Sequence, residues 1–109
     1  MENWKNIKID GIAAIEKRVA SFKIYQLRLI PSLFFEVQIT ENSNGFFIGV
    51  TDIGLNSAID ESVDFGCGCG DTIEKALEFT LNNFIKMINE RNDVTPDSFT
   101  WLDEYWARK

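Results

Sequence analysis

The sequence predicts an α+β fold in which an antiparallel sheet of about four strands packs against one long amphipathic helix, with short helices near the chain ends. Three observations predict it. Apolar and polar residues alternate along residues 33–40 and 46–50, the period of a half-buried strand. Between residues 73 and 88 the apolar residues recur at helical spacing instead. A length of 109 residues, without repeats or linkers, predicts one domain over residues 1–109.

The composition is that of a globular protein. Hydrophobic residues make up 45% of the chain, and nine Phe and three Trp supply large side chains for a core. No apolar run approaches the roughly 18 residues that a membrane-spanning helix requires, and residues 1–5 show no apolar signal segment. We therefore expect a cytoplasmic protein with no membrane partner.

The N-terminal third is the least regular part of the pattern. Asp10 could cap a short helix through Val19, because apolar residues recur there at helical spacing. A strand is the alternative, since Gly11 interrupts that helix. Residues 22–30 predict a strand whose buried side switches after Ile24, which indicates a bulge.

A hairpin and a fourth strand follow. Asn44 and Gly45 tolerate positive φ, so residues 41–45 predict a hairpin loop between the strands at 33–40 and 46–50. In the second of these strands the alternating apolar residues are Phe46, Ile48 and Val50. After an acidic loop, one face of the fourth strand comprises Val63, Phe65, Cys67 and Cys69.

Glycines occupy the other face of the fourth strand. Gly66, Gly68 and Gly70 leave that face without side chains, so we expect a helix to pack closely against it. Asp71 with Glu74 predicts a capping box at the start of the next helix. The apolar stripe of this helix comprises Ile73, Ala76, Leu77, Leu81, Phe84, Ile85 and Ile88.

Residues suited to catalysis or metal binding are scarce. The chain has no His, so the commonest general base and all Ser-His and Cys-His pairs are absent. Cys67 and Cys69 are its two cysteines, whereas a zinc site needs four ligands; we expect both thiols to be buried and structural. A phosphate cradle before the helix is disfavoured, because Asp71 and Glu74 would repel a phosphate. We expect no catalytic residue, no metal, no cofactor and no enzymatic activity.

Charge is unevenly distributed along the chain. The net charge is −6, yet residues 1–28 carry six basic residues against three acids, and residues 29–109 carry five against fourteen. From Asp52 through Asp71 there are five acids and no base. This argues against direct nucleic-acid binding and favours a basic protein partner, although charge can also serve solubility alone. The acids expected to contact the partner are Asp52, Asp60, Glu61 and Asp64.

Large aromatic residues gather near the C-terminus. Residues 101–106 combine three of them with two acids, a mixture typical of interface anchors. We expect a short helix after Pro96 to present them to the partner. Alternatively, this helix covers the open sheet face and its rings belong to the core. The three candidates are Trp101, Tyr105 and Trp106.

The entry to the long helix carries a family resemblance. GDTIEKAL at residues 70–77, following the NGFF hairpin at 44–47, resembles the helix entry of the HicB antitoxins. The likeness spans residues 33–88 and implies a three-stranded sheet with a helix. The Pro-Asp-Leu-Pro-Gly-Cys segment of that family is replaced by TDIG at 51–54, and nothing after residue 90 resembles its DNA-binding segment.

A second resemblance concerns function. In size, acidity, lack of catalytic groups and the FTWLD tail at residues 99–103, the chain resembles small immunity proteins of bacterial contact-dependent and polymorphic toxin systems. This resemblance implies a cognate toxin, often a nuclease with a basic active site. We expect a non-enzymatic inhibitor, monomeric or homodimeric, that masks such a toxin with its acidic surface. The alternatives are a phage- or plasmid-encoded inhibitor of a host nuclease or defence complex, and a small-ligand pocket or enzyme between sheet and helix.

Overall fold

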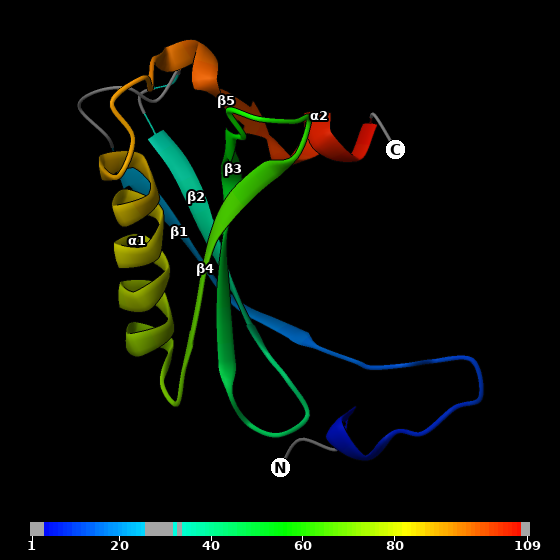
Figure 1. Cartoon of the computed structure of the whole chain (residues 1–109). Helices are drawn as coiled ribbons and strands as arrows, with labels where there is room; N and C mark the ends of the chain where they lie inside the picture. The colour runs from blue at the N-terminus through cyan, green and yellow to red at the C-terminus, as the bar shows by residue number, and fades with distance from the viewer. Residues whose placement is uncertain (1–3, 26–31, 33, 108–109) are drawn as a thin grey trace.

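The computed structural model describes residues 4–25, 32 and 34–107 (Figure 1). One long helix stands along one face of a twisted antiparallel sheet, and a short helix lies on the other side. In chain order the elements are η1 (Trp4–Asn6), β1 (Lys17–Tyr25), β2 (Phe34–Glu41), β3 (Phe47–Asn56), β4 (Val63–Gly70), α1 (Ile73–Asn89), η2 (Pro96–Ser98), β5 (Phe99–Trp101) and α2 (Leu102–Ala107).

The sheet has the order β1-β2-β3-β4, and β5 also pairs with β3. All of these pairings are antiparallel, so the predicted α+β fold is confirmed. No helix among the described residues is both long enough and apolar enough to span a membrane. The core lies between α1 and the sheet, and its buried members are Phe35, Val37, Ile39, Ile53, Ala76, Phe84 and Ile88.

The glycine face of β4 packs directly against α1, as predicted. A Cβ atom at Gly66 would lie 2.6 Å from the Phe84 Cβ, and one at Gly68 would lie 2.6 Å from the Thr80 backbone nitrogen. Real Cβ atoms do not approach other atoms so closely. The absent side chains therefore allow the helix and strand backbones to meet.

The N-terminal region differs from one prediction. Residues Asp10 and Gly11 form a turn, with Gly11 at φ 91°, and no helix forms before β1. The helix option fails because the chain from Lys17 onward pairs with β2. The register shift in β1 falls between Arg18 and Ala20 rather than after Ile24. Residues 26–30 of the expected strand lie outside the described part of the chain.

The apolar alternation in β3 does not mark the buried side. Gly49, Thr51, Ile53 and Leu55 on one side are buried, as is Gly54, whereas Phe46 is exposed and Ile48 and Val50 are half-buried. The reason is the proximity of α1: a Cβ at Gly49 would lie 2.2 Å from the Thr80 hydroxyl oxygen. The inner side of β3 must therefore be small at this point, and Ile48 and Val50 lie on the opposite side.

The ends of the helices also differ in detail from prediction. Thr72, not Asp71, caps α1, because its hydroxyl accepts a hydrogen bond from the Lys75 backbone N–H at 3.1 Å. Asp71 instead forms an ion pair with the Lys75 side chain at 3.2 Å. Ile85, a member of the predicted apolar stripe, is 39% exposed. Near the C-terminus, Trp101 ends the short strand β5 and the helix α2 begins only after it.

Candidate partner-binding surface

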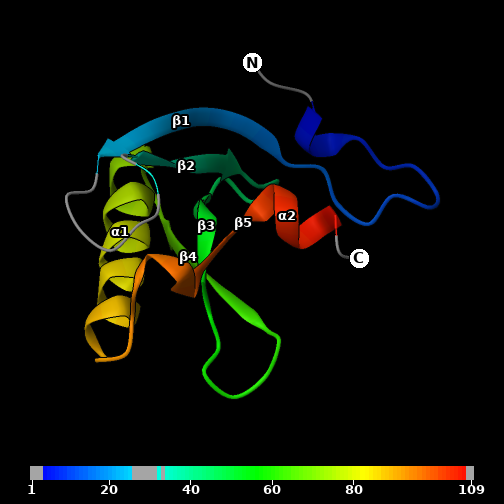
Figure 2. The same ribbon diagram turned by 90° about the horizontal axis from the view of Figure 1, so that it is seen from above.

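The loop between β3 and β4, residues 57–62, forms a protruding tip that we call the hairpin tip (Figure 2). Ser57 and Ser62 close it, since the Ser57 N–H donates to the Ser62 carbonyl at 2.9 Å. The Ser57 hydroxyl oxygen accepts from the Ile59 N–H at 3.1 Å. The Asp60 carboxylate accepts from the Ser62 N–H at 2.9 Å and from its hydroxyl at 2.6 Å. These bonds stabilise the observed conformation of the loop.

The hairpin tip combines a hydrophobic side chain with two carboxylates. Ile59 is 95% exposed, and Asp60 and Glu61, which follow it directly, are exposed as well. The hydrogen bonds from the Ser62 hydroxyl and N–H, followed by that of Ser57, lower the pKa of Asp60 below its ordinary value of 3.8. Asp60 is therefore negatively charged at neutral pH, beside an isoleucine that covers nothing in this chain's core.

Asp64 lies in β4, next to the base of the hairpin tip. Its charge contributes to the raised pKa of Arg91, after the larger effect of the hydrogen bonds from Arg91 to Asp93. Arg91 also donates to the Asn56 carbonyl at 2.6 Å, which ties the C-terminal end of α1 to the end of β3. Because a basic residue stands nearby, Asp64 presents less negative potential to a partner than Asp60 and Glu61 do.

Asp52 has a structural role at the point where β2 diverges from β3. Its carboxylate accepts a hydrogen bond from the Glu36 backbone N–H at 2.9 Å. Beyond this point β5 pairs with β3, beginning at Ile53 opposite Trp101. Burial raises the pKa of Asp52, and the nearby Glu36 and Asp103 carboxylates act in the same direction, although the Glu36 N–H opposes them.

The three aromatic candidates have different environments. Trp101 packs against the hydrophobic core from β5. The Tyr105 ring meets the Phe65 ring edge-on at 5.5 Å, which holds α2 against the sheet face opposite α1. The centroids of the Trp106 and Tyr105 rings lie 5.7 Å apart, and Trp106 is 63% exposed. The alternative that this segment covers the open sheet face is therefore correct for Tyr105, and Trp106 is the most exposed of the three rings.

The predicted site residues do not form one continuous patch. The hairpin tip and β5 border a hollow of about 600 Å³, lined by Asn56, Asp60, Glu61, Ser62, Val63 and Thr100. The loop of the hairpin tip and α2 lie at the same end of the sheet (Figure 1). Asp60, Glu61 and Trp106 are therefore available to a partner at that end, whereas Asp52, Trp101 and Tyr105 are occupied within the fold.

The prediction that both cysteines are buried is wrong. Cys67 and Cys69 are exposed free thiols. Because the glycines of β4 face α1, the cysteines between them must point to the other sheet face, beside Val50 and Ile48 of β3. Among the described residues, no group of three or more Cys, Asp and Glu side chains is arranged to hold a metal ion.

Sequence reasoning missed Ile59. One feature of the sequence could have indicated it. Ile59 is an apolar residue between Ala58 and two acids, in a loop whose residues do not alternate between apolar and polar as in a buried strand. No family model matches this chain, and neither a similar curated protein nor a similar solved structure was found. The HicB-like and immunity-protein resemblances therefore rest on the residues quoted for them.

Proposed function

We propose that this protein is a non-enzymatic inhibitor that binds a basic protein, as an immunity protein does when it neutralises a cognate bacterial toxin. One observation carries the proposal. The hairpin tip, ordered by its own hydrogen bonds, presents Ile59 at 95% exposure beside the Asp60 and Glu61 carboxylates. An ordered loop binds with a smaller loss of conformational entropy than a mobile one.

The chemistry of the tip favours a nuclease as the target. A nuclease holds phosphate with Lys and Arg side chains, and the Asp60 and Glu61 carboxylates can pair with the same cations. Ile59 would enter an apolar pocket beside them, and Trp106 would supply a second anchor from α2. Inhibition then follows from occupying the substrate site, in the cytoplasm where the nuclease would reach its nucleic acid.

Three of the predicted contact residues also have partners within the fold. Asp52 holds the Glu36 N–H, Trp101 packs on the core and Tyr105 packs on Phe65. Substituting any of these three would change stability as well as binding. Asp60, Glu61 and Trp106 are the predicted contacts that can be changed without disturbing the core.

Charge reversal at the tip tests the proposal. The variant carrying Asp60→Lys and Glu61→Lys should keep its folded core although the loop loses the hydrogen bonds between Ser62 and Asp60. It should bind the toxin at least about tenfold more weakly and lose protection in cells that express the toxin. The matched control carries Asp10→Lys and Glu16→Lys, two exposed acids in the segment that precedes β1, and should protect like the wild type. Equal protection by both variants would refute the tip mechanism.

The identity of the captured protein separates the two inhibitor classes. A toxin encoded beside this gene supports the immunity role. A host defence nuclease or nucleic-acid-binding complex would favour the anti-defence alternative instead, with the same tip residues at the contact.

A further inference from the structure

We propose that two copies of this chain form a dimer by exchanging N-terminal arms. The arm is defined as residues 4–16, which precede β1. The apolar side of each arm would lie in an apolar groove between β1 and α1 of the other copy. This contact uses neither the hairpin tip nor Trp106, so it is independent of the proposed inhibitor function.

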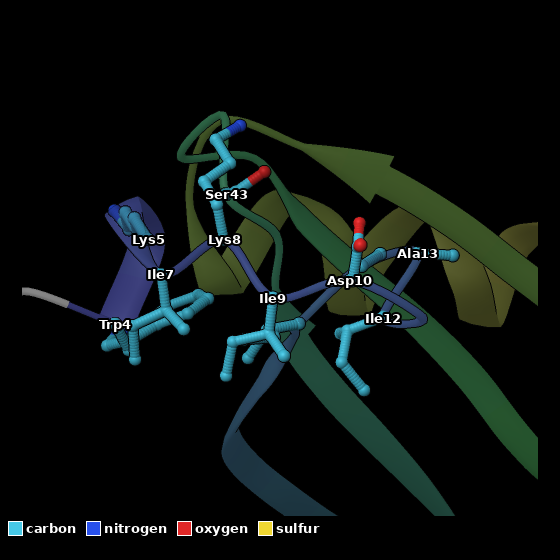
Figure 3. Close-up of a pocket in the computed structure, with 11 residues that line it drawn as sticks. Trp4, Lys5, Ile7, Lys8, Ile9, Asp10, Ile12, Ala13 and Ser43 are labelled. Carbon is cyan, nitrogen blue, oxygen red and sulfur yellow. The ribbon is translucent and has the colours of Figure 1, made fainter.

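The arm has an apolar side that its own chain leaves exposed. Ile7, Ile9 and Ile12 are 49%, 62% and 54% exposed. In Figure 3 these three side chains point to one side of the arm, and Asp10 points to the other. Three exposed isoleucines in thirteen residues are costly in water unless a partner covers them.

The groove lies where α1 leaves part of the sheet uncovered. α1 packs chiefly on β4 and β3 and makes few contacts with β2. The inner side of β1 is consequently only half covered, and Phe22 lines a hollow of about 450 Å³ together with Leu77 and Leu81 of α1. The polar residues at its edge are Glu74, Glu78 and Asn82.

Charge complementarity identifies a second copy as the occupant. The arm carries Lys5 and Lys8 in its first six residues, and Asp10 and Glu16 follow them. The groove carries two glutamates and no base, and the neighbouring Lys75 is already paired with Asp71. Lys5 of the arm pairs with Glu41 of its own chain, so Lys8 is the arm cation placed to meet the glutamates at the groove.

The position of the arm favours exchange over folding back. Between η1 and β1 the arm loops out from the body on the side far from α1, as both views show (Figures 1 and 2), and Lys5 in η1 pairs with Glu41 at the end of β2. The radius of gyration is 15.5 Å, whereas a compact domain of this length has one of about 13 Å. In a two-fold dimer both arm-to-groove contacts form together, which doubles the buried area.

The first experiment measures the mass of the full-length protein in solution by sedimentation or light scattering. At about 100 μM we expect twice the chain mass of 12.5 kDa. Ile9→Asp should weaken dimerisation roughly 10- to 100-fold, because it places a charge in the apolar groove. A monomeric wild type at that concentration would overturn the proposal, and so would an Ile9→Asp variant that dimerises normally.

A charge swap then tests the pairing itself. Lys8→Glu and Glu78→Lys should each weaken the dimer about fivefold, and the double variant should regain most of the loss. Glu90→Lys, at the C-cap of α1 and outside the groove, is the control and should not change the dimer. Absence of rescue in the double variant would exclude the Lys8–Glu78 contact.

The arm could also fold onto its own groove, and labelling distinguishes the two cases. In a mixture of isotope-labelled and unlabelled chains, we expect intermolecular magnetisation transfer between the methyl groups of Ile9 and those of Leu77 or Leu81. Transfer found only within one chain would overturn the exchange.

Discussion

Gly68 is the position where the backbone of β4 comes closest to α1. Replacing it with Ala would place a Cβ 2.6 Å from the Thr80 nitrogen and 2.7 Å from the Phe79 carbonyl carbon, both of them backbone atoms. We expect Gly68→Ala to lower the free energy of unfolding by about 1–3 kcal/mol, measured by denaturant titration. Cys67→Ala, at an exposed neighbour, is the control and should change it by less than about 0.5 kcal/mol.

Asp60 should titrate below the ordinary aspartate value of 3.8, because the folded loop stabilises its charged form. With a lowered pKa in the folded state, this stabilisation is complete above the unfolded value and is lost as the pH falls through the folded one. Ser62→Ala removes the hydroxyl and should raise the Asp60 pKa, as measured by NMR titration of the side-chain carboxyl carbon. A wild-type pKa at or above 3.8 would contradict the described hydrogen bonds.

Asp52 should show the opposite pH dependence. Its raised pKa means that the folded state binds the proton more tightly than the unfolded state, so this group lowers stability as the pH rises from 3.8 through the folded value. Asp52→Asn keeps an oxygen to accept the Glu36 N–H and should abolish that part of the pH dependence. Asp52→Ala loses the acceptor and should cost about 1 kcal/mol at neutral pH. If denaturation shows that both variants are equally destabilised, the hydrogen bond from the Glu36 N–H does not account for the contribution of Asp52 to stability.

At the scale of elements, α2 joins the stability of the sheet to the proposed interface. Tyr105→Ala should lower the free energy of unfolding by about 1 kcal/mol, since it removes an edge-on ring pair with Phe65. Trp106→Ala should leave stability nearly unchanged and weaken partner binding. Thermal denaturation and a binding titration on the same two variants separate the roles. Strong destabilisation by Trp106→Ala would assign that ring to the fold instead.

The elements themselves were largely predictable from sequence, but their orientation was not. The α1 stripe and the glycines of β4 specify that helix and strand pack together. Glycine spacing also implied that Cys67 and Cys69 point away from α1, but their exposure depends on α2 covering only part of that face. The buried side of β3 could not be predicted, because it depends on contacts with residues that are distant in sequence. Gly49 lies against Thr80 of α1, and the Thr51 hydroxyl accepts a hydrogen bond from the Gly66 N–H of β4.

The candidate site shows the same limit. Acidity selected Asp52, Asp60 and Glu61 alike as partner contacts. It could not distinguish the exposed Asp60 and Glu61 from Asp52, whose carboxylate accepts the Glu36 N–H. The distinction depends on the place where β3 stops pairing with β2 and begins to pair with β5. This change of partner joins segments that are far apart in the sequence, so a local pattern does not predict it.

Both edges of the sheet are protected against adding a strand. The Cys67 N–H at the β4 edge donates to the Asn83 side chain of α1 at 3.0 Å. The β1 edge contains a register shift beside Arg18 and carries Lys17 and Lys23. Charges and irregularities of this kind oppose strand addition. A partner is therefore expected to meet loops and faces of this protein rather than extend its sheet.

At the scale of the whole molecule, the net charge of −6 should govern association with a basic partner. Raising the ionic strength from about 0.01 M to about 0.15 M shortens the screening length from about 30 Å to about 8 Å. We expect the association rate constant to fall roughly tenfold over that range while the dissociation rate changes little. Stopped-flow measurements would show this, and a rate independent of salt would mean that charge does not guide the encounter.

The central claim is that the hairpin tip is the part of the molecule that a basic partner covers. Hydrogen–deuterium exchange on the complex co-purified from the native host tests it most directly. Binding should slow exchange across residues 57–62 and in α2 near Trp106, with little change along the arm. Protection confined to other surfaces, with unchanged exchange in the hairpin tip, would contradict the account.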